Sequence, residues 1–374
     1  MAETFQVRDF FNPKVVTAMG ERFKKVKATF DKAGFIAFIN PKLAALTYSE
    51  RLQLITEGQE KFLPQSFPTA AKLIVDSLLP PYGSDELDET NNRFIVATKA
   101  AYIAKNGLDH FDISMNALYE ITKRMSSEWG VRPFFIKYPE QTLAVFKKWA
   151  SDENPHVRRL VSEGSRPSLP WGKKLPQFEK DPKPTLALLE LLKNDPSEYV
   201  RRSVANHLND HTKKHPDLVV ETLKRWQSES INKDKMRMIK HALRTLLKKG
   251  HAGALDILGY KKGAKVAVQQ LVADEKVKVG DYLNFSFNLQ STGKTKQPLM
   301  IDYVIYYQKA NGELAPKVFK MTTKELGAEA SLLLKKRQSF KVITTRKFHL
   351  GAHQLAIQVN GEELAKVDFE LVEH

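Results

Sequence analysis

The sequence predicts a mainly α protein, in which a solenoid of helical repeats is followed by a small all-β sandwich. Three observations predict this fold. Up to about residue 255, apolar residues recur at three- and four-residue spacing, as they do on amphipathic helices. After Gly263 they alternate with polar residues, as on half-buried strands. Within the helical part, similar segments return after 43 and 39 residues, a spacing typical of stacked helical pairs.

Composition and charge limit the classes of protein that fit. The chain has 374 residues, a hydrophobic fraction of 42% and a net charge of +16, and such a basic balance favours a nucleic-acid partner. It has no cysteine, which excludes disulfides and thiolate metal sites. No run is apolar enough for a membrane helix, and the first residues lack the pattern of a signal peptide. We therefore expect a cytoplasmic protein with no membrane partner.

The helical part is assigned to residues 1–255. Amphipathic spacing predicts helices over Ser114–Arg124, Gln141–Ala150 and Pro184–Lys193. The segment Asn154–Val161 resembles Asp195–Val204, and a looser copy follows at residues 234–243. Periods of about 40–47 residues are typical of HEAT- or armadillo-like repeats, which stack into a solenoid with an extended concave face.

The β part is assigned to residues 263–374. Alternation of Leu283, Phe285, Phe287 and Leu289 predicts one strand, and the β-branched and aromatic segment Pro298–Lys309 predicts another. Asn-Gly pairs at 311–312 and 360–361 indicate hairpin turns. About seven short strands in this length indicate an immunoglobulin-like sandwich. The glycine- and lysine-rich segment 248–263 is expected to be a linker.

Dibasic steps recur along the helical part, and two of them occupy equivalent places in successive repeats. These are Arg158-Arg159 and Arg201-Arg202. Neighbouring residues on a helix point about 100° apart, so one member of each pair can face a groove. We predict that these arginines contact DNA phosphates. The alternative is a solvated helix face.

Three acidic residues stand at or near predicted helix ends, where a carboxylate is mildly unfavourable. Glu163 precedes Gly164, Glu128 lies in a Ser-Ser-Glu-Trp-Gly segment, and Asp210 closes a helix predicted over 200–209. Three such acids in a basic scaffold indicate a negative spot within a positive groove. Arg159 and Arg166 would share a helix face with Glu163 if that helix continued.

An aromatic residue follows in a Pro/Gly loop, Ser-Leu-Pro-Trp-Gly, which would present Trp171 to a ligand. The alternative for Trp171 is a place in the core. His207, His211 and His215 could line one face as zinc ligands, but the sequence favours ordinary polar helix residues and no metal. No phosphate-binding glycine loop is present, so we expect no nucleotide cofactor and no cofactor of another kind.

The segments Asn154–Trp171 and Tyr199–Asp210 resemble the AlkC-type DNA glycosylases, a bacterial family of HEAT-like-repeat enzymes. The resemblance covers the whole chain and includes the C-terminal immunoglobulin-like domain of one subgroup. It implies excision of 3-methyladenine, and in some members 3-methylcytosine, from DNA. It also implies that the functional acids are Glu163, Glu128 and Asp210, that the motif arginines are Arg159 and Arg166, and that the loop tryptophan is Trp171.

The implied chemistry agrees with these residue types. A base alkylated at a ring nitrogen is already cationic, so it leaves without a general acid, and a carboxylate then stabilises the oxocarbenium-like sugar and positions water. We expect Glu163 to face the sugar C1′, Trp171 to stack on the base or deoxyribose, and Arg159, Arg166 and Arg202 to hold phosphates. The expected partner is double-stranded DNA with alkylated bases, bound by a monomer at the bacterial nucleoid. The alternative is a non-enzymatic scaffold that binds DNA or an acidic protein.

Overall fold

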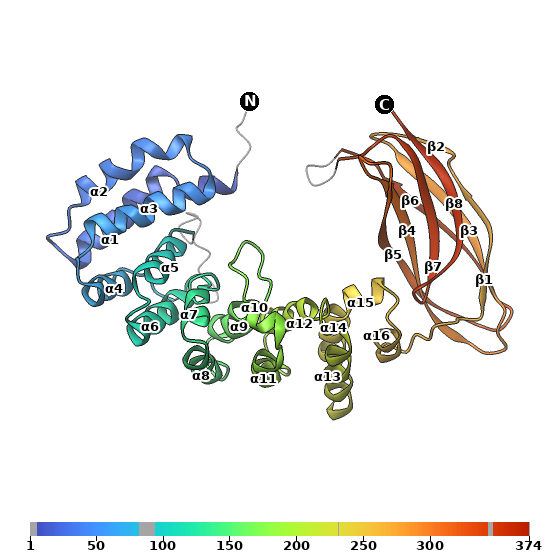
Figure 1. The fold of residues 1–374 in the computed structure, drawn as a ribbon, viewed down its shortest axis with the longest axis horizontal. Helices are drawn as coiled ribbons and strands as arrows, with labels where there is room; N and C mark the ends of the chain where they lie inside the picture. Colours follow the sequence, from blue (N-terminus) through green and yellow to red (C-terminus); the bar gives the residue numbers. More distant parts are fainter. Residues whose placement is uncertain (1–5, 82–93, 231, 343–346, 374) are drawn as a thin grey trace. The chain divides into compact units, whose positions relative to one another are not determined.

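The structure is a computed structural model that describes residues 6–81, 94–230, 232–342 and 347–373 (Figure 1). These residues divide into two compact units. The first lies within residues 1–214 and 232–238, and the second within 215–231 and 239–374. No helix in the described ranges combines the length and the apolar character of a membrane span.

All the regular secondary structure in the described part of residues 1–257 is helical, as the sequence predicts for residues up to about 255. The helices before the repeats are η1 (Val7–Phe10), α1 (Pro13–Val26), α2 (Lys32–Ile39), η2 (Asn40–Ala45), α3 (Tyr48–Phe62), α4 (Phe67–Asp76), α5 (Ile95–Asn106) and α6 (Phe111–Thr122). Those that follow are α7 (Arg132–Lys137), α8 (Pro139–Trp149), α9 (Pro155–Gly164), α10 (Pro176–Lys180), α11 (Lys183–Leu192), α12 (Glu198–His211), α13 (Pro216–Glu229), α14 (Lys233–Ala242), α15 (Arg244–Lys248) and α16 (Ala252–Ile257).

The 43-residue repeat corresponds to two stacked helical pairs. The pair α8 and α9 packs on the pair α11 and α12, with α9 against α12 and α8 against α11. Helix α9 begins where the side chain of Asn154 accepts a hydrogen bond from the His156 amide at 2.8 Å, with Pro155 at the first helical position. Val161 in α9 and its equivalent Val204 in α12 are fully buried, so the repeated apolar positions form the core between the pairs.

One arginine in each repeat fastens its own turn to the next repeat. Arg158 donates to both carboxylate oxygens of Asp195, at 2.6 and 3.0 Å, and also to two backbone carbonyls of the preceding turn. Arg201, 43 residues later, donates to Asp234 at 2.8 Å and likewise to two carbonyls of its own preceding turn. We call these contacts the turn locks. They give the first arginine of each dibasic step a structural role.

The β part is a two-sheet sandwich of the predicted immunoglobulin-like type. Its sheets have the strand orders β1-β3-β6 and β2-β8-β7-β4-β5, and the pairing is antiparallel except between β2 and β8. The core between the sheets includes Leu283, Phe285, Phe287 and Leu289, which confirms the alternation. The structure describes eight strands, one more than expected: β1 (Val266–Ala273), β2 (Lys276–Lys278), β3 (Tyr282–Ser291), β4 (Gln297–Gln308), β5 (Leu314–Leu326), β6 (Ser331–Ser339), β7 (Gly351–Val359) and β8 (Glu362–Val372).

The segment expected to be a linker, 248–263, is instead structured and packed, which corrects that expectation. It contains α16, and within the second unit it lies against the β7–β8 hairpin. A Cβ atom on Gly361 would lie 2.2 Å from the Cα of Gly250, so the two backbones touch there. The side chain of Asn360 donates to the carbonyl of Lys261 at 2.8 Å. Gly250 is required here because the two backbones approach closely.

Candidate active site

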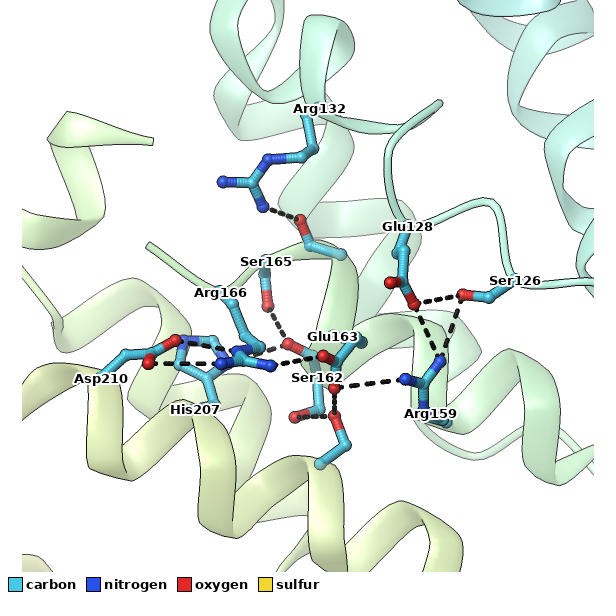
Figure 2. A network of polar contacts seen from close by, with 12 residues as sticks. Ser126, Glu128, Arg132, Arg159, Ser162, Glu163, Ser165, Arg166, His207 and Asp210 are labelled. Atoms are coloured by element: carbon cyan, nitrogen blue, oxygen red, sulfur yellow. Dashed lines mark hydrogen bonds and ion pairs between the residues drawn. The ribbon is translucent and has the colours of Figure 1, made fainter. Parts of the chain in front are cut away.

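The three predicted acids come together in the first unit, from three separate segments (Figure 2). Glu163 lies in the last turn of α9 and Asp210 in the last turn of α12, as predicted. Glu128 lies in the turn before α7, several residues after α6 ends, so its predicted place at a helix C-terminus was wrong. The acids meet because α9 packs on α12 and the turn before α7 reaches the end of α9.

Two arginines join the three carboxylates into one chain of alternating charge (Figure 2). Arg159 contacts Glu128 at 2.9 Å and Glu163 at 3.6 Å. Arg166 contacts Glu163 at 2.5 Å and holds both oxygens of Asp210, at 2.8 and 3.3 Å. We call this chain, Glu128–Arg159–Glu163–Arg166–Asp210, the charge chain. Arg166 reaches both acids although α9 ends at Gly164, so the premise of a continued helix was not needed.

The three carboxylates differ in how much of each remains available. The side chain of Glu163 is 6% exposed, that of Asp210 10% and that of Glu128 20%. Both oxygens of Glu163 and both of Asp210 have partners within the protein. Glu128 uses only Oε2, which accepts from Arg159 and Ser126, while its Oε1 has no hydrogen-bond partner among the described residues. Glu128 is thus the acid best placed to meet a ligand.

The expected negative spot is balanced by positive charge. Besides the two arginines of the charge chain, Arg132 is fully buried nearby and its guanidinium interacts electrostatically with all three acids. Burial lowers the pKa of Arg132 to about 10, which leaves it protonated at neutral pH. Three guanidinium groups therefore face three carboxylates. The site is a preorganised array of charges rather than an uncompensated negative patch.

The predicted phosphate-binding arginines fall into three situations. Arg159 and Arg166 are mostly buried in the charge chain, and Arg158 and Arg201 form the turn locks. Arg202 is the most exposed of the five, with a side chain 66% exposed that forms an ion pair with Glu198 on the same helix. Contact of these residues with DNA stays a prediction, and the structure favours Arg202 for it.

Trp171 lies on the surface, not in the core. Its side chain is 85% exposed, and its backbone φ of +58° lies in the left-handed region that a bulky residue rarely adopts. The buried guanidinium of Arg132 anchors this loop. It donates to the backbone carbonyls of Gly164 and Pro167, which precede Trp171, and of Lys173, which follows it. A strained, exposed aromatic on a clamped loop is typical of a ligand contact.

A pocket of about 530 Å³ opens beside this loop. Trp171 and Glu128 both line it, together with the small side chains of α5 and the ring of Trp129. Most of its surface is apolar, and Lys105 and Lys173 also contribute to its lining. The pocket therefore places apolar surface next to the most exposed carboxylate of the charge chain.

One face of α12 supplies residues that sequence reasoning missed. Tyr199, Ser203, His207 and Asp210 follow one another at helical spacing. Arg159 stacks over the Tyr199 ring at 4.7 Å, and the Ser203 hydroxyl donates to Glu163 at 2.6 Å. Only Asp210 was predicted, because serine, tyrosine and histidine on a helix usually indicate nothing more than a polar surface. The helical spacing of the four was the available signal.

His207 is a neutral member of this face. Its Nδ1 lies 2.9 Å from the carbonyl oxygen of Ser162, which can only accept, so Nδ1 carries the proton. Burial lowers the pKa of His207 well below its usual value, and His211 and Arg166 add to this effect. Burial also raises the pKa of Asp210, although the hydrogen bond from Arg166 opposes that shift. No cluster suited to a metal ion occurs in the part of the chain that the structure describes.

Comparison with known proteins identifies the family. Residues 125–246 match a family model described as DNA alkylation repair enzyme, and residues 267–373 match the C-terminal Ig-like domain of the uncharacterised protein YhaZ. Protein YhaZ of Bacillus subtilis (strain 168) is 34% identical over 98% of this chain and 99% of its own length. The solved structure of the Pseudomonas fluorescens alkylpurine DNA glycosylase AlkC, bound to DNA containing an abasic site analog, is 36% identical over 98% of this chain and 99% of its own, with a TM-score of 0.90.

The helical scaffold with its charge chain, followed by an Ig-like sandwich, therefore defines an enzyme of DNA alkylation repair. The chain belongs to the AlkC-type family of alkylpurine DNA glycosylases. This confirms the resemblance that the segments Asn154–Trp171 and Tyr199–Asp210 indicated.

Proposed function

We propose that this protein hydrolyses the N-glycosidic bond of cationic alkylated bases in double-stranded DNA, with 3-methyladenine as its main substrate and 3-methylcytosine as a second one. The observation that carries the proposal is the free Oε1 of Glu128, beside a pocket and an exposed tryptophan. AlkC, 36% identical over nearly the whole chain, supports the same chemistry.

The substrate supplies part of the catalysis. A base that already carries a positive charge leaves as a neutral molecule, so the enzyme needs no proton donor. What remains is to stabilise the positive charge that develops on the deoxyribose and to position a water molecule. A carboxylate performs both tasks in glycoside hydrolysis. Neutral bases leave too slowly under this mechanism, which restricts the substrates to cationic lesions.

Glu128 is assigned the contact with the sugar and the water, in place of the sequence-based expectation for Glu163. Its Oε2 is fixed by Arg159 and Ser126, so the carboxylate is held in place while its Oε1 remains available beside the pocket that Glu128 lines. Glu163, with both oxygens bound, fixes Arg159 and Arg166 at the centre. Charges held in place before the reaction need no reorganisation in the transition state, which is usually the largest catalytic contribution.

Trp171 and the pocket are assigned to binding the damaged nucleotide. The exposed indole offers a face to a cationic base or to the deoxyribose, a contact worth about 0.5–2 kcal/mol. A nucleotide seated in the apolar pocket next to Glu128 would displace water from that region, which strengthens the electrostatic interaction. Arg202 is assigned to a flanking phosphate because its guanidinium is exposed. We propose that a monomer at the bacterial nucleoid suffices, since all of these residues lie in one unit.

The test compares Glu128→Gln and Glu163→Gln with the exposed control Glu198→Gln. Single-turnover release of 3-methyladenine from methylated duplex DNA is followed by chromatography, and affinity is measured on DNA with an abasic analogue. We expect Glu128→Gln to lower the release rate about 100-fold or more, as for loss of a group that stabilises transition-state charge, with affinity changed less than about twofold. Glu163→Gln should also be strongly impaired, and Glu198→Gln should match the wild type.

Wild-type release by both Glu128→Gln and Glu163→Gln would refute the proposed mechanism. Failure of the wild-type protein to release any methylated base would instead support the rival function, a scaffold that binds DNA or an acidic protein without chemistry.

A further inference from the structure

The face of α12 that meets α9 contacts the charge chain at several points. Tyr199 lies under Arg159, Ser203 binds Glu163, and Asp210 binds Arg166. His207 binds the carbonyl of Ser162, the residue before Glu163. Because these contacts come from one helix, the position of α12 determines where the charges stand. Ser203 is the member that touches the central carboxylate.

Ser203 forms a short hydrogen bond in a fixed direction. Its Oγ lies 2.6 Å from Oε2 of Glu163 and 2.9 Å from Oγ of Ser162, and both serines are buried. An ionised carboxylate can only accept, so the single hydroxyl proton of Ser203 points to Glu163. The hydroxyl of Ser162 is then oriented to donate to Ser203. The two hydroxyls thus form a short relay that ends on Glu163.

The position of Oε2 of Glu163 depends on the hydrogen bond from Ser203. The shortest contact of the carboxylate is from Arg166 to Oε1, whereas Arg159 reaches Oε2 only at 3.6 Å. Without Ser203, Oε2 would be free to turn toward Arg159 and compete for it with Glu128, which now holds that guanidinium at 2.9 Å. Because Ser203 is neutral, it supplies a donor without a fourth positive charge among the three carboxylates and three guanidinium groups.

We propose that Ser203 is a positioning residue for the glycosylase reaction: its hydroxyl holds Glu163 in place and, through Arg159, keeps the free oxygen of Glu128 aimed at the substrate. The inference rests on the function proposed above for the carboxylates. Ser203 itself does not touch the substrate.

The first experiment compares Ser203→Ala with the matched control Ser165→Ala. Ser165 is equally buried in the same cluster, but its hydroxyl bonds only to backbone carbonyls, those of Val161 and Ser162. We expect Ser203→Ala to lower the single-turnover release of 3-methyladenine about tenfold, which corresponds to about 1.4 kcal/mol in the barrier. Affinity for abasic DNA should stay within about twofold. Ser203→Thr, which keeps a hydroxyl, should recover most of the rate.

The second experiment places Ser203→Ala in the Glu163→Gln background. If the serine acts through Glu163, the double variant should be no slower than Glu163→Gln alone, because residues that act as a unit are not additive. Additive losses, or an equal loss in Ser165→Ala, would show a general structural effect and overturn the proposal. A wild-type rate in Ser203→Ala would also overturn it. If Glu163→Gln and Glu128→Gln remained inactive in that case, the proposed function would stand.

Discussion

Arg166 joins two buried carboxylates, so its removal should be among the most damaging single changes in the first unit. Arg166→Met keeps most of the side-chain volume but deletes the guanidinium that contacts Glu163 at 2.5 Å and Asp210 at 2.8 and 3.3 Å. The partner side chains are 6% and 10% exposed, so water cannot replace the lost bonds. Removing one member of a buried ion pair costs about 3–5 kcal/mol, and we expect a loss in that range at pH 8.

The loss should depend on pH, with a definite sign. Burial raises the pKa of Asp210 above its ordinary value even though Arg166 opposes the shift. Without Arg166, the folded protein holds a proton on that carboxyl to a higher pH than the unfolded chain does. Stability then falls as the pH rises through this window. The variant should therefore lie closer to the wild type at pH 5 than at pH 8.

The assay is urea unfolding at pH 5 and pH 8, with Arg202→Met as the control. Arg202 carries the same charge on the next repeat, but its side chain is 66% exposed and its pair with Glu198 is worth less than about 1 kcal/mol. Glycosylase activity of Arg166→Met should fall together with its stability. A loss in Arg166→Met no larger than that in Arg202→Met, or a loss that grows toward pH 5, would refute the reasoning.

Three further predictions concern other parts of the chain. Burial raises the pKa of Asp302 from 3.8 to about 6 despite nearby Lys320 and Lys248. The unfolded chain loses this proton at a lower pH than the folded protein does, so stability falls as the pH rises from 4 to 6. Asp302→Asn should therefore add up to about 3 kcal/mol of stability at pH 7.5 and little at pH 4 in thermal unfolding. Burial lowers the pKa of Lys99 to about 7, so stability should rise between pH 7 and pH 10; Lys99→Met should remove that rise, and an unchanged slope in denaturant unfolding would contradict this. Gly361→Ala should destabilise by more than the strain of a left-handed residue, about 1–3 kcal/mol, because its Cβ would meet Gly250; Gly312→Ala, with the same φ of +81° and open space around it, is the control that measures the strain alone.

Periodicity predicted the fold well because it reports burial directly. The helices α6, α8 and α11, the strands β3 and β4, and the repeat of α9 in α12 all appear close to their predicted positions. The segment 248–263 was misjudged, because glycine serves close backbone packing as well as flexibility. The contact between Gly250 and Gly361 joins positions far apart in the sequence, which no local pattern reveals.

The sequence predicted which acidic residues converge, but it did not predict which arginines bind them. Helix-terminal position singled out Glu163 and Asp210, and both converge with Glu128 in the structure. The sequence does not show which partner a long arginine side chain reaches, so Arg159 and Arg166 were expected to face phosphates. Arg132 drew no attention because a buried arginine cannot be told from an exposed one by its neighbours in the chain.

The turn locks affect how steeply the affinity for DNA should fall as the salt concentration rises. Each phosphate that a protein neutralises releases counterions. The slope of log affinity against log salt concentration then becomes more negative by about 0.9. Arg158 and Arg201 are fastened within the scaffold and Arg159 is held in the charge chain, so Arg202 is the one mobile cation that these two dibasic steps offer to the duplex. A titration in rising sodium chloride should therefore give a shallower line than the number of basic side chains suggests, by about three contacts for these steps.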